Sequence, residues 1–320
     1  ISYFDYYKEK NKKAWYHYFN NILLKEVEKL ISGDIFLFPE NLGGIFRFKK
    51  FKCKSIFIIL DLFEMRSKNK LIYLVKKARF KNVLNKGDKI ITISNYCKDD
   101  IAKNFPSFSE KIFVYYPFFI DSENINTIII DEKSIERPEN IEKYLEGKFI
   151  LANGSGQERK NAEFLLHNAN QIYNDFGLKI VLFGKDFYEN GYANINDSIK
   201  KCNCADKVVH IGAVSDEKLK TLYKQATCFV FPSLDEGFGL PPVEALQNGC
   251  KIAVSNISIF REVLSPLDRY FDFTYESFSK NLKAVLEMTD LQFEKEKNSI
   301  LEKFQYQNYK KTLFSILFSK

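Results

Sequence analysis

Short apolar runs alternate with amphipathic stretches along the whole chain of 320 residues, and this alternation limits the fold more than any other feature. The apolar runs, such as residues 149–153 and 228–231, are four or five residues long and therefore suit strands rather than helices. The stretches between them have helical length. This order is typical of βα units in parallel sheets, so the sequence predicts an α/β protein.

The length suits two domains of about 150 residues each. A loose stretch at 121–140 is the predicted linker. In the first half we expect strands at 1–4, 35–38, 55–60, 89–93 and 112–115, and helices at 14–30, 70–85 and 98–105, with Ser94 as a helix N-cap. In the second half we expect strands at 149–153, 179–183, 207–211, 228–231 and 251–254, and helices at 161–176, 216–226, 242–248 and from residues 277 and 291 onward.

Charge is distributed unevenly between the two halves. Residues 1–120 contain 23 lysines and arginines against 12 acidic residues, whereas residues 121–320 contain 25 against 29. Much of the excess lies at 46–54 (FRFKKFKCK) and 76–81 (KKARFK), where phenylalanine alternates with basic residues. Such a surface can dock on an anionic membrane, or it can be a plain solvated face. No nucleic-acid-binding signature accompanies the charge, so nucleic acid is not an expected partner.

Neither a membrane span nor a structural metal site is indicated. No run of 18 or more uncharged apolar residues occurs, and residues 6–13 are polar where a signal peptide would be apolar. The six cysteines are dispersed, and nothing completes a zinc site beside Cys202 and Cys204. We therefore expect a soluble protein with reduced thiols in the cytoplasm.

The most informative segment is 231–249 (FPSLDEGFGLPPVEALQNG). A buried strand is expected to end at Phe231, and Pro241 and Pro242 suit the start of the following helix. Gly237 and Gly239 would let a ligand approach the backbone closely. The amides at the start of the helix would favour an anion such as a diphosphate.

Two carboxylates, Glu236 and Glu244, flank this turn eight positions apart. Either one could accept hydrogen bonds from the hydroxyls of a sugar or a ribose. We expect Glu244 in the first turn of the helix, where an acid is also favoured by the helix dipole alone. The pair by itself therefore leaves both readings open.

Residues 236–245 (EGFGLPPVEA) resemble the E-x7-E signature of retaining glycosyltransferases of family 4, the glycosyl transferases group 1. Residues 153–161 (NGSGQERKN), 208–219 (VVHIGAVSDEKL) and 255–263 (SNISIFREV) are similar to other parts of the family's donor domain. The likeness covers residues 148–290, and residues 90–100 and 109–117 match the acceptor domain more loosely.

The resemblance implies the GT-B fold, two Rossmann-like domains facing across a cleft. An acceptor-binding domain would span 1–140 and a donor-binding domain 141–300. A C-terminal helix within 301–320 would cross back to the first domain.

The resemblance also implies roles for residues. Arg159 and Lys160 would neutralise the donor diphosphate as it leaves; cations at a helix start are unfavourable unless an anion is present. Glu236 would contact the transferred sugar and Glu244 the ribose. The implied donor-binding residues are Gly154, Ser155, Gly212, Val214, Gly237, Phe238, Gly239, Leu240 and Glu244.

The first half departs from the family pattern at two places. The loop at 12–18 (KKAWYHY) contains no glycine, so a close backbone contact with the donor is in question. Leu60 stands before Asp61 where relatives carry a histidine. We expect Asp61 to take part of that histidine's role among the catalytic residues, and His17 is an alternative.

The expected activity is retaining transfer of a sugar from a UDP- or GDP-linked donor to a hydroxyl of a glycan. No D-x-D pair occurs, so neither a metal nor another cofactor is expected. The expected acceptor is an O-antigen or capsule intermediate on polyprenyl diphosphate, with the protein peripheral on the inner face of the cell membrane. A catalytically inactive binding or scaffold partner is the main alternative. A nucleotide-dependent oxidoreductase is disfavoured because Arg159 replaces the third glycine of its fingerprint.

Overall fold

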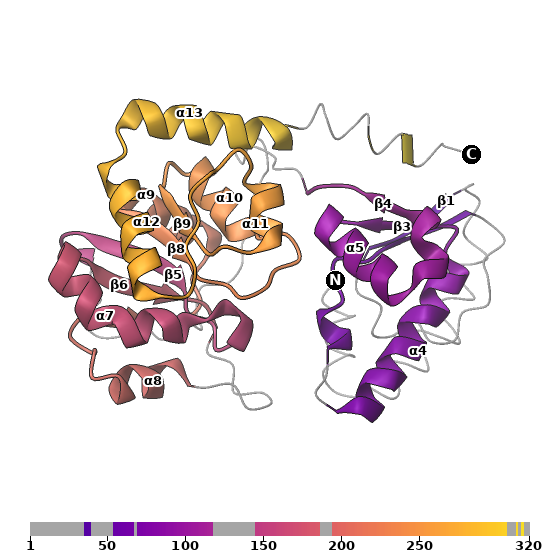
Figure 1. Cartoon of the computed structure of the whole chain (residues 1–320), viewed down its shortest axis with the longest axis horizontal. Coiled ribbons are helices and arrows are strands. Elements are labelled where there is room, and N and C mark those ends of the chain that lie inside the picture. The colour runs from indigo at the N-terminus through magenta and orange to yellow at the C-terminus, as the bar shows by residue number, and fades with distance from the viewer. Residues whose placement is uncertain are drawn as a thin grey trace. The chain divides into compact units, whose positions relative to one another are not determined.

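The computed structural model describes residues 35–39, 54–66, 69–117, 145–185, 194–305, 312 and 315–316. The chain divides into two units, Ile1–Pro117 with Gln307–Lys320, and Phe118–Tyr306 (Figure 1). Several predictions fall outside the described residues: the elements at 1–4 and 14–30, the loop at 12–18 with His17, the linker at 121–140 and the domain boundary at 140.

In its described residues the first unit contains a parallel sheet of four strands. They lie in the order β1 (Ile35–Pro39), β2 (Lys54–Ile58), β3 (Lys89–Thr92) and β4 (Ile112–Val114). Helices with described bounds are α4 (Lys70–Lys86) and α5 (Asn95–Asn104), with short 3-10 helices η2 (Phe63–Met65) and η3 (Pro106–Lys111). All four described strands were predicted from their apolar runs, to within two residues at either end.

Each face of this sheet has its own apolar cluster. On one face Phe57 and Ile90 form a core with Phe80 and Leu84 of α4. On the other face Ile56 and Ile91 pack with Ile316, which lies within the predicted C-terminal helix at 301–320. Lys89 Nζ donates a hydrogen bond of 2.6 Å to the carbonyl oxygen of Ile316. The end of the chain is therefore part of the first unit.

Ser94 caps α5, as predicted. Its hydroxyl accepts a hydrogen bond from the Cys97 amide at 3.0 Å, and its backbone is extended. The helix begins at Asn95, directly after the cap, and not at residue 98 as expected. The polar run 95–100 has no apolar periodicity, so the cap is the better marker of where this helix starts.

The described part of the second unit contains a parallel sheet of five strands. They are β5 (Phe149–Asn153), β6 (Lys179–Phe183), β7 (Val208–His210), β8 (Cys228–Phe231) and β9 (Ile252–Val254), in the order β7-β6-β5-β8-β9. This is the strand order of a Rossmann-type sheet, in which the direction of winding reverses between β5 and β8. The predicted bounds of β5, β6 and β8 agree with the structure because these buried strands are unbroken apolar runs.

Helices cover both faces of the second sheet (Figure 1). Leu166 of α7 (Ala162–Phe176), Ile195 of α8 (Ile195–Lys201) and Leu282 of α12 (Tyr275–Glu287) pack in one cluster with Ile150 and Leu182 of the sheet. The remaining helices are α9 (Asp216–Gln225), α10 (Leu240–Gln247), α11 (Ser258–Val263) and α13 (Asp290–Leu301), followed by η6 (Glu302–Phe304).

Aromatic side chains mark the opposite face of the same sheet. Tyr223 of α9 meets the Phe229 ring edge-on at 5.3 Å between centroids, and Phe260 of α11 lies 5.7 Å from Phe231. The odd-numbered residues of β8 therefore face α9 and α11, while its even-numbered residues face the other helix layer. Two layers of helices around a parallel sheet confirm the predicted α/β class.

No helix within the described ranges is both long enough and apolar enough to cross a lipid bilayer.

Candidate active site

The loops that follow β5 and β8 lie side by side at the carboxyl edge of the second sheet, because the two strands are hydrogen-bonded neighbours. This edge, where the winding reverses, is where open α/β sheets bind ligands. Two contacts join the loops directly: Leu234 N donates to Arg159 O at 2.8 Å, and Asn161 Nδ2 donates to Pro232 O at 3.2 Å. The two loops therefore pack as one surface at this edge of the sheet.

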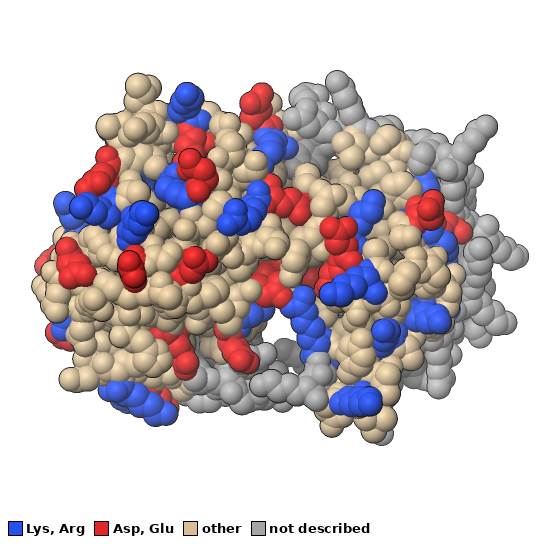
Figure 2. Space-filling model, in the orientation of Figure 1, with Lys and Arg blue, Asp and Glu red and all other residues tan. Residues whose placement is uncertain are grey.

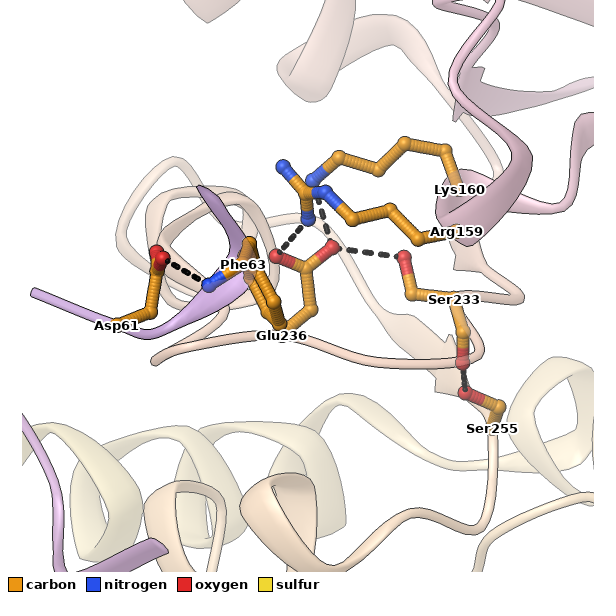
Figure 3. Close-up of polar contacts among 7 residues, drawn as sticks. All are labelled: Asp61, Phe63, Arg159, Lys160, Ser233, Glu236 and Ser255. Atoms are coloured by element: carbon orange, nitrogen blue, oxygen red, sulfur yellow. Dashed lines mark hydrogen bonds and ion pairs between the residues drawn. The ribbon is translucent and has the colours of Figure 1, made fainter. Parts of the chain in front are cut away.

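Glu236, in the loop after β8, forms ion pairs with two cations, one through each carboxylate oxygen (Figure 3). Arg159 Nη1 is 2.7 Å from Glu236 Oε2, and Lys160 Nζ is 2.6 Å from Glu236 Oε1. The structure thus brings together three of the four predicted catalytic residues, although Glu236 is 76 positions from Lys160 in the sequence. Two cations face one carboxylate, so the cluster has one positive charge in excess.

Lys160 and Glu236 are both buried, whereas Arg159 is partly open to solvent. The side chains of Lys160 and Glu236 are 9% and 7% exposed, against 31% for Arg159. Burial lowers the pKa of Lys160 from its ordinary value; Glu236 opposes that shift and the positive charge of Arg159 adds to it. The Lys160 ammonium also lies over the Phe231 ring, 4.7 Å from its centroid.

Two buried serines hold Glu236 in place, Ser233 directly and Ser255 through Ser233 (Figure 3). The Ser233 hydroxyl donates to Glu236 Oε1 at 2.9 Å, and the Ser255 hydroxyl donates to the Ser233 carbonyl oxygen at 2.6 Å. Both serines have no exposed surface. Neither serine was predicted as a site residue. The available signal was a hydroxyl residue two positions after an entirely apolar strand, three positions before Glu236.

Two glycines are required by close packing around these loops. A Cβ on Gly154, directly after β5, would lie 2.6 Å from Leu182 Cβ. Gly239 has a φ of +86°, and a Cβ there would lie 2.5 Å from Phe260 Cε1. Gly239 is also the N-cap of α10, and within the described part of the chain no side chain caps that helix start. Pro241 and Pro242 in its first turn carry no N–H, so the Leu240 amide is the first-turn donor left to a ligand or to water.

Glu244 lies beyond the first turn of α10, and not in the first turn as predicted. The helix α10 begins at Leu240, two residues earlier than predicted, so Glu244 falls beyond the first turn, which contains no acid. The dipole explanation for an acid at this position therefore does not apply. Burial, and secondly the nearby Asp216, raise the pKa of the Glu244 carboxyl. A half-buried acid on this helix is consistent with binding of a polar partner.

The other predicted donor-binding residues lie at the same carboxyl edge. Ser155 follows β5 and is buried, and Gly212 and Val214 are half-buried in the loop after β7. Gly237 and Phe238 are buried in the loop after β8, and Leu240 is 39% exposed at the start of α10. Phe238 packs edge-on against Phe304 at 5.8 Å. Their roles toward a donor remain predictions.

Asp61 belongs to the first unit. Its Oδ1 accepts a hydrogen bond of 2.9 Å from the Phe63 amide, at the start of η2. This contact fixes the turn that follows β2. A part in catalysis stays a prediction for Asp61.

Across the described ranges, no three His, Cys, Asp or Glu side chains are grouped as ligands of a metal ion would be.

We expect Ser233→Ala to lower kcat about 10- to 100-fold, since a hydrogen bond to a charged group contributes about 1.5–3 kcal/mol. KM for the donor should change little, because Glu236 would be present but less well oriented. Steady-state kinetics with a nucleotide-sugar donor check this. Ser198→Ala, which removes another buried hydroxyl from α8, is the matched control. Equal losses in the two variants would show that Ser233 acts through packing alone.

Two curated sequences illustrate what the chain is similar to. The O-antigen chain mannosyltransferase RfbU of Salmonella typhimurium is 30% identical over 195 residues, covering 60% of this chain and 50% of the relative. The serotype-specific mannosyltransferase WbdA of Escherichia coli is 26% identical over 257 residues, covering 72% of this chain and 30% of the relative. The chain thus spans half the length of the first relative and less of the second.

Solved structures show the fold. A glycosyltransferase from Rickettsia africae superposes with a TM-score of 0.66 over 94% of this chain and 81% of its own, at 17% identity. WaaG, a glycosyltransferase involved in lipopolysaccharide biosynthesis, gives a TM-score of 0.61 over 93% and 81%, at 14% identity. These likenesses and the two parallel sheets confirm the predicted GT-B fold class.

The family description "Glycosyl transferases group 1" matches residues 133–302, which is more than half of the chain. The matched residues include both loops of the candidate site and all five described strands of the second sheet. It agrees with the resemblance identified from residues 153–161 and 236–245. The chain therefore belongs to the glycosyl transferases group 1 family.

Proposed function

We propose that the protein transfers a sugar from a nucleotide-sugar donor to a hydroxyl of a glycan, with retention of anomeric configuration. The observation that carries this proposal is the buried Glu236 carboxylate held between Arg159 and Lys160 at the point where the sheet reverses its winding. The excess positive charge of this cluster and the positive end of the α10 dipole suit a diphosphate. The carboxylate suits the hydroxyls of the sugar beside it.

The reaction would break the bond between the anomeric carbon and the diphosphate oxygen. The acceptor hydroxyl oxygen attacks the same face of that carbon, its proton passes to the departing diphosphate, and a nucleoside diphosphate leaves. Arg159 and Lys160 would turn from Glu236 toward the diphosphate and stabilise the charge that develops on it. Glu236, released from the cations, would then accept hydrogen bonds from the transferred sugar. Glu244 would bind the ribose, and Gly212 and Val214 would border the base.

We propose that no metal takes part, because the two cations can supply the electrostatic stabilisation that a divalent ion would otherwise give. Mannose is the first sugar to test, since RfbU and WbdA are both named mannosyltransferases. The proposed acceptor is a polyprenyl-diphosphate-linked glycan of surface polysaccharide, met by a cytoplasmic protein at the inner face of the cell membrane. The basic character of the first half supports this location.

A thermal-shift panel of UDP- and GDP-linked sugars tests the function, because a ligand that binds only the folded protein raises Tm by mass action. We expect one donor to raise Tm and to be consumed only when an acceptor glycan is added. Addition of EDTA should leave turnover unchanged. A donor that raises Tm but is never consumed would favour a non-catalytic binding partner, and loss of turnover in EDTA would overturn metal-independence.

A further inference from the structure

The outward side of α4, in the first unit, carries an apolar face. We define it as Leu71, Ile72, Leu74 and Val75, whose exposed fractions are 71%, 46%, 51% and 44%. All four lie in the first two turns of the helix. Leu71, Leu74 and Val75 are spaced i, i+3 and i+4, so their side chains form one continuous stripe.

This apolar face is not the side that stabilises the fold. The inward side of α4 consists of Phe80, Val83 and Leu84, which are at most 8% exposed in the core of the unit. A surface helix normally directs polar residues away from its core. Here the outward side of the first two turns is apolar as well, and among the described residues of the unit the fold gives no reason for it.

The same helix is strongly basic. It contains six lysines and arginines and no acidic residue. Lys77 turns inward, where its ammonium lies 5.6 Å from the Tyr73 ring and 5.8 Å from the Phe105 ring. Lys70, at the start of the helix, and Arg79 and Lys81, beyond the first two turns, are exposed. Figure 2 shows blue and no red side chains over the lower half of the helix.

We propose that α4 docks on an anionic lipid bilayer. Leu71, Ile72, Leu74 and Val75 would enter the boundary between headgroups and acyl chains, and Lys70, Arg79 and Lys81 would contact lipid phosphates. A stripe of aliphatic side chains bordered by cations is complementary to such an interface. A protein partner would need a matching apolar groove lined with acids. The bilayer fits the unbroken positive charge of the helix without any such pairing.

Sedimentation with vesicles tests the proposal on the full chain. The probes are vesicles of phosphatidylglycerol mixed with phosphatidylcholine, and vesicles of phosphatidylcholine alone, at low and at physiological salt. We expect binding to the anionic vesicles that weakens as salt is added. Leu71→Ser combined with Leu74→Ser should weaken binding at least tenfold, and so should Lys70→Gln combined with Arg79→Gln and Lys81→Gln. Leu291→Ser is the matched control, because Leu291 is 81% exposed in the second unit.

Undiminished binding of both α4 variants, or equal loss in the Leu291 control, would overturn the proposal. So would a change in oligomeric state of the leucine variant with no change in vesicle binding, which would assign the apolar face to a second copy of the chain. The inference rests on the proposed function only for the lipid-linked nature of the acceptor. Transfer to a short water-soluble acceptor should be unaffected by the α4 variants, so membrane docking and sugar transfer can fail separately.

Discussion

Glu236→Gln should lower kcat/KM for sugar transfer about 100- to 1000-fold, in the range seen when one preorganised polar group of an active site is removed. The glutamine has nearly the same shape but lacks the charge that Arg159 and Lys160 contact at 2.7 and 2.6 Å. It also accepts hydrogen bonds from sugar hydroxyls less strongly than a carboxylate does. Initial rates over a range of donor concentrations measure the effect.

Glu236→Ala should also destabilise the fold. It leaves the buried Lys160 ammonium without its carboxylate, and breaking a buried ion pair from one side costs about 3–5 kcal/mol. Chemical denaturation measures the free energy of unfolding. Glu287→Gln, which removes an exposed carboxylate from α12, is the control and should change neither quantity. Activity of Glu236→Gln close to that of the unchanged protein would contradict the proposed role.

Lys160→Met should lower kcat about 100- to 1000-fold, because the leaving diphosphate would lose one of its two cations. Binding of the product separates this role from a general loss of structure. Calorimetry should show weaker binding of the nucleoside diphosphate to Lys160→Met, with binding of the matching nucleoside nearly unchanged. Equal weakening of both ligands would indicate that the variant has simply damaged the site.

The pH dependence provides a second readout for Lys160. Burial lowers the pKa of this lysine, so in the free protein the ammonium loses its proton at a lower pH than an ordinary lysine does. The neutral amine cannot stabilise the diphosphate. We therefore expect kcat/KM to fall as pH rises through that lowered pKa. Lys160→Arg, which stays charged, should move this alkaline limb to higher pH. An alkaline limb that Lys160→Arg leaves in place would assign it to another group.

Much of the fold could be predicted because buried parallel strands appear in the sequence as unbroken apolar runs. The bounds of β5, β6 and β8 follow directly from residues 149–153, 179–183 and 228–231. The two short helices α8 and α11 were missed, since seven and six residues are too few for a helical period to be recognised. For α8 a signal existed: the Asn194 side chain accepts from the Asn196 and Asp197 amides as an N-cap.

The candidate site was predictable only in part. Its residue types followed from the resemblance of residues 236–245 and 153–161 to the family. That Glu236 pairs with Arg159 and Lys160 did not follow, because this depends on β5 and β8 being neighbours in a sheet whose order no short segment encodes. The hydrogen bond from Ser233 and the support of Ser255 depend on the same long-range geometry.

The packing of Gly239 against Phe260 has an evolutionary consequence. The position combines a left-handed φ with a space that a single methyl group would overfill, so almost any replacement must move the aromatic ring of α11 as well. A single substitution of Gly239 is therefore expected to destabilise this turn. A change of sugar specificity in this fold is therefore expected to come from the side chains around the turn, because the turn itself tolerates few replacements.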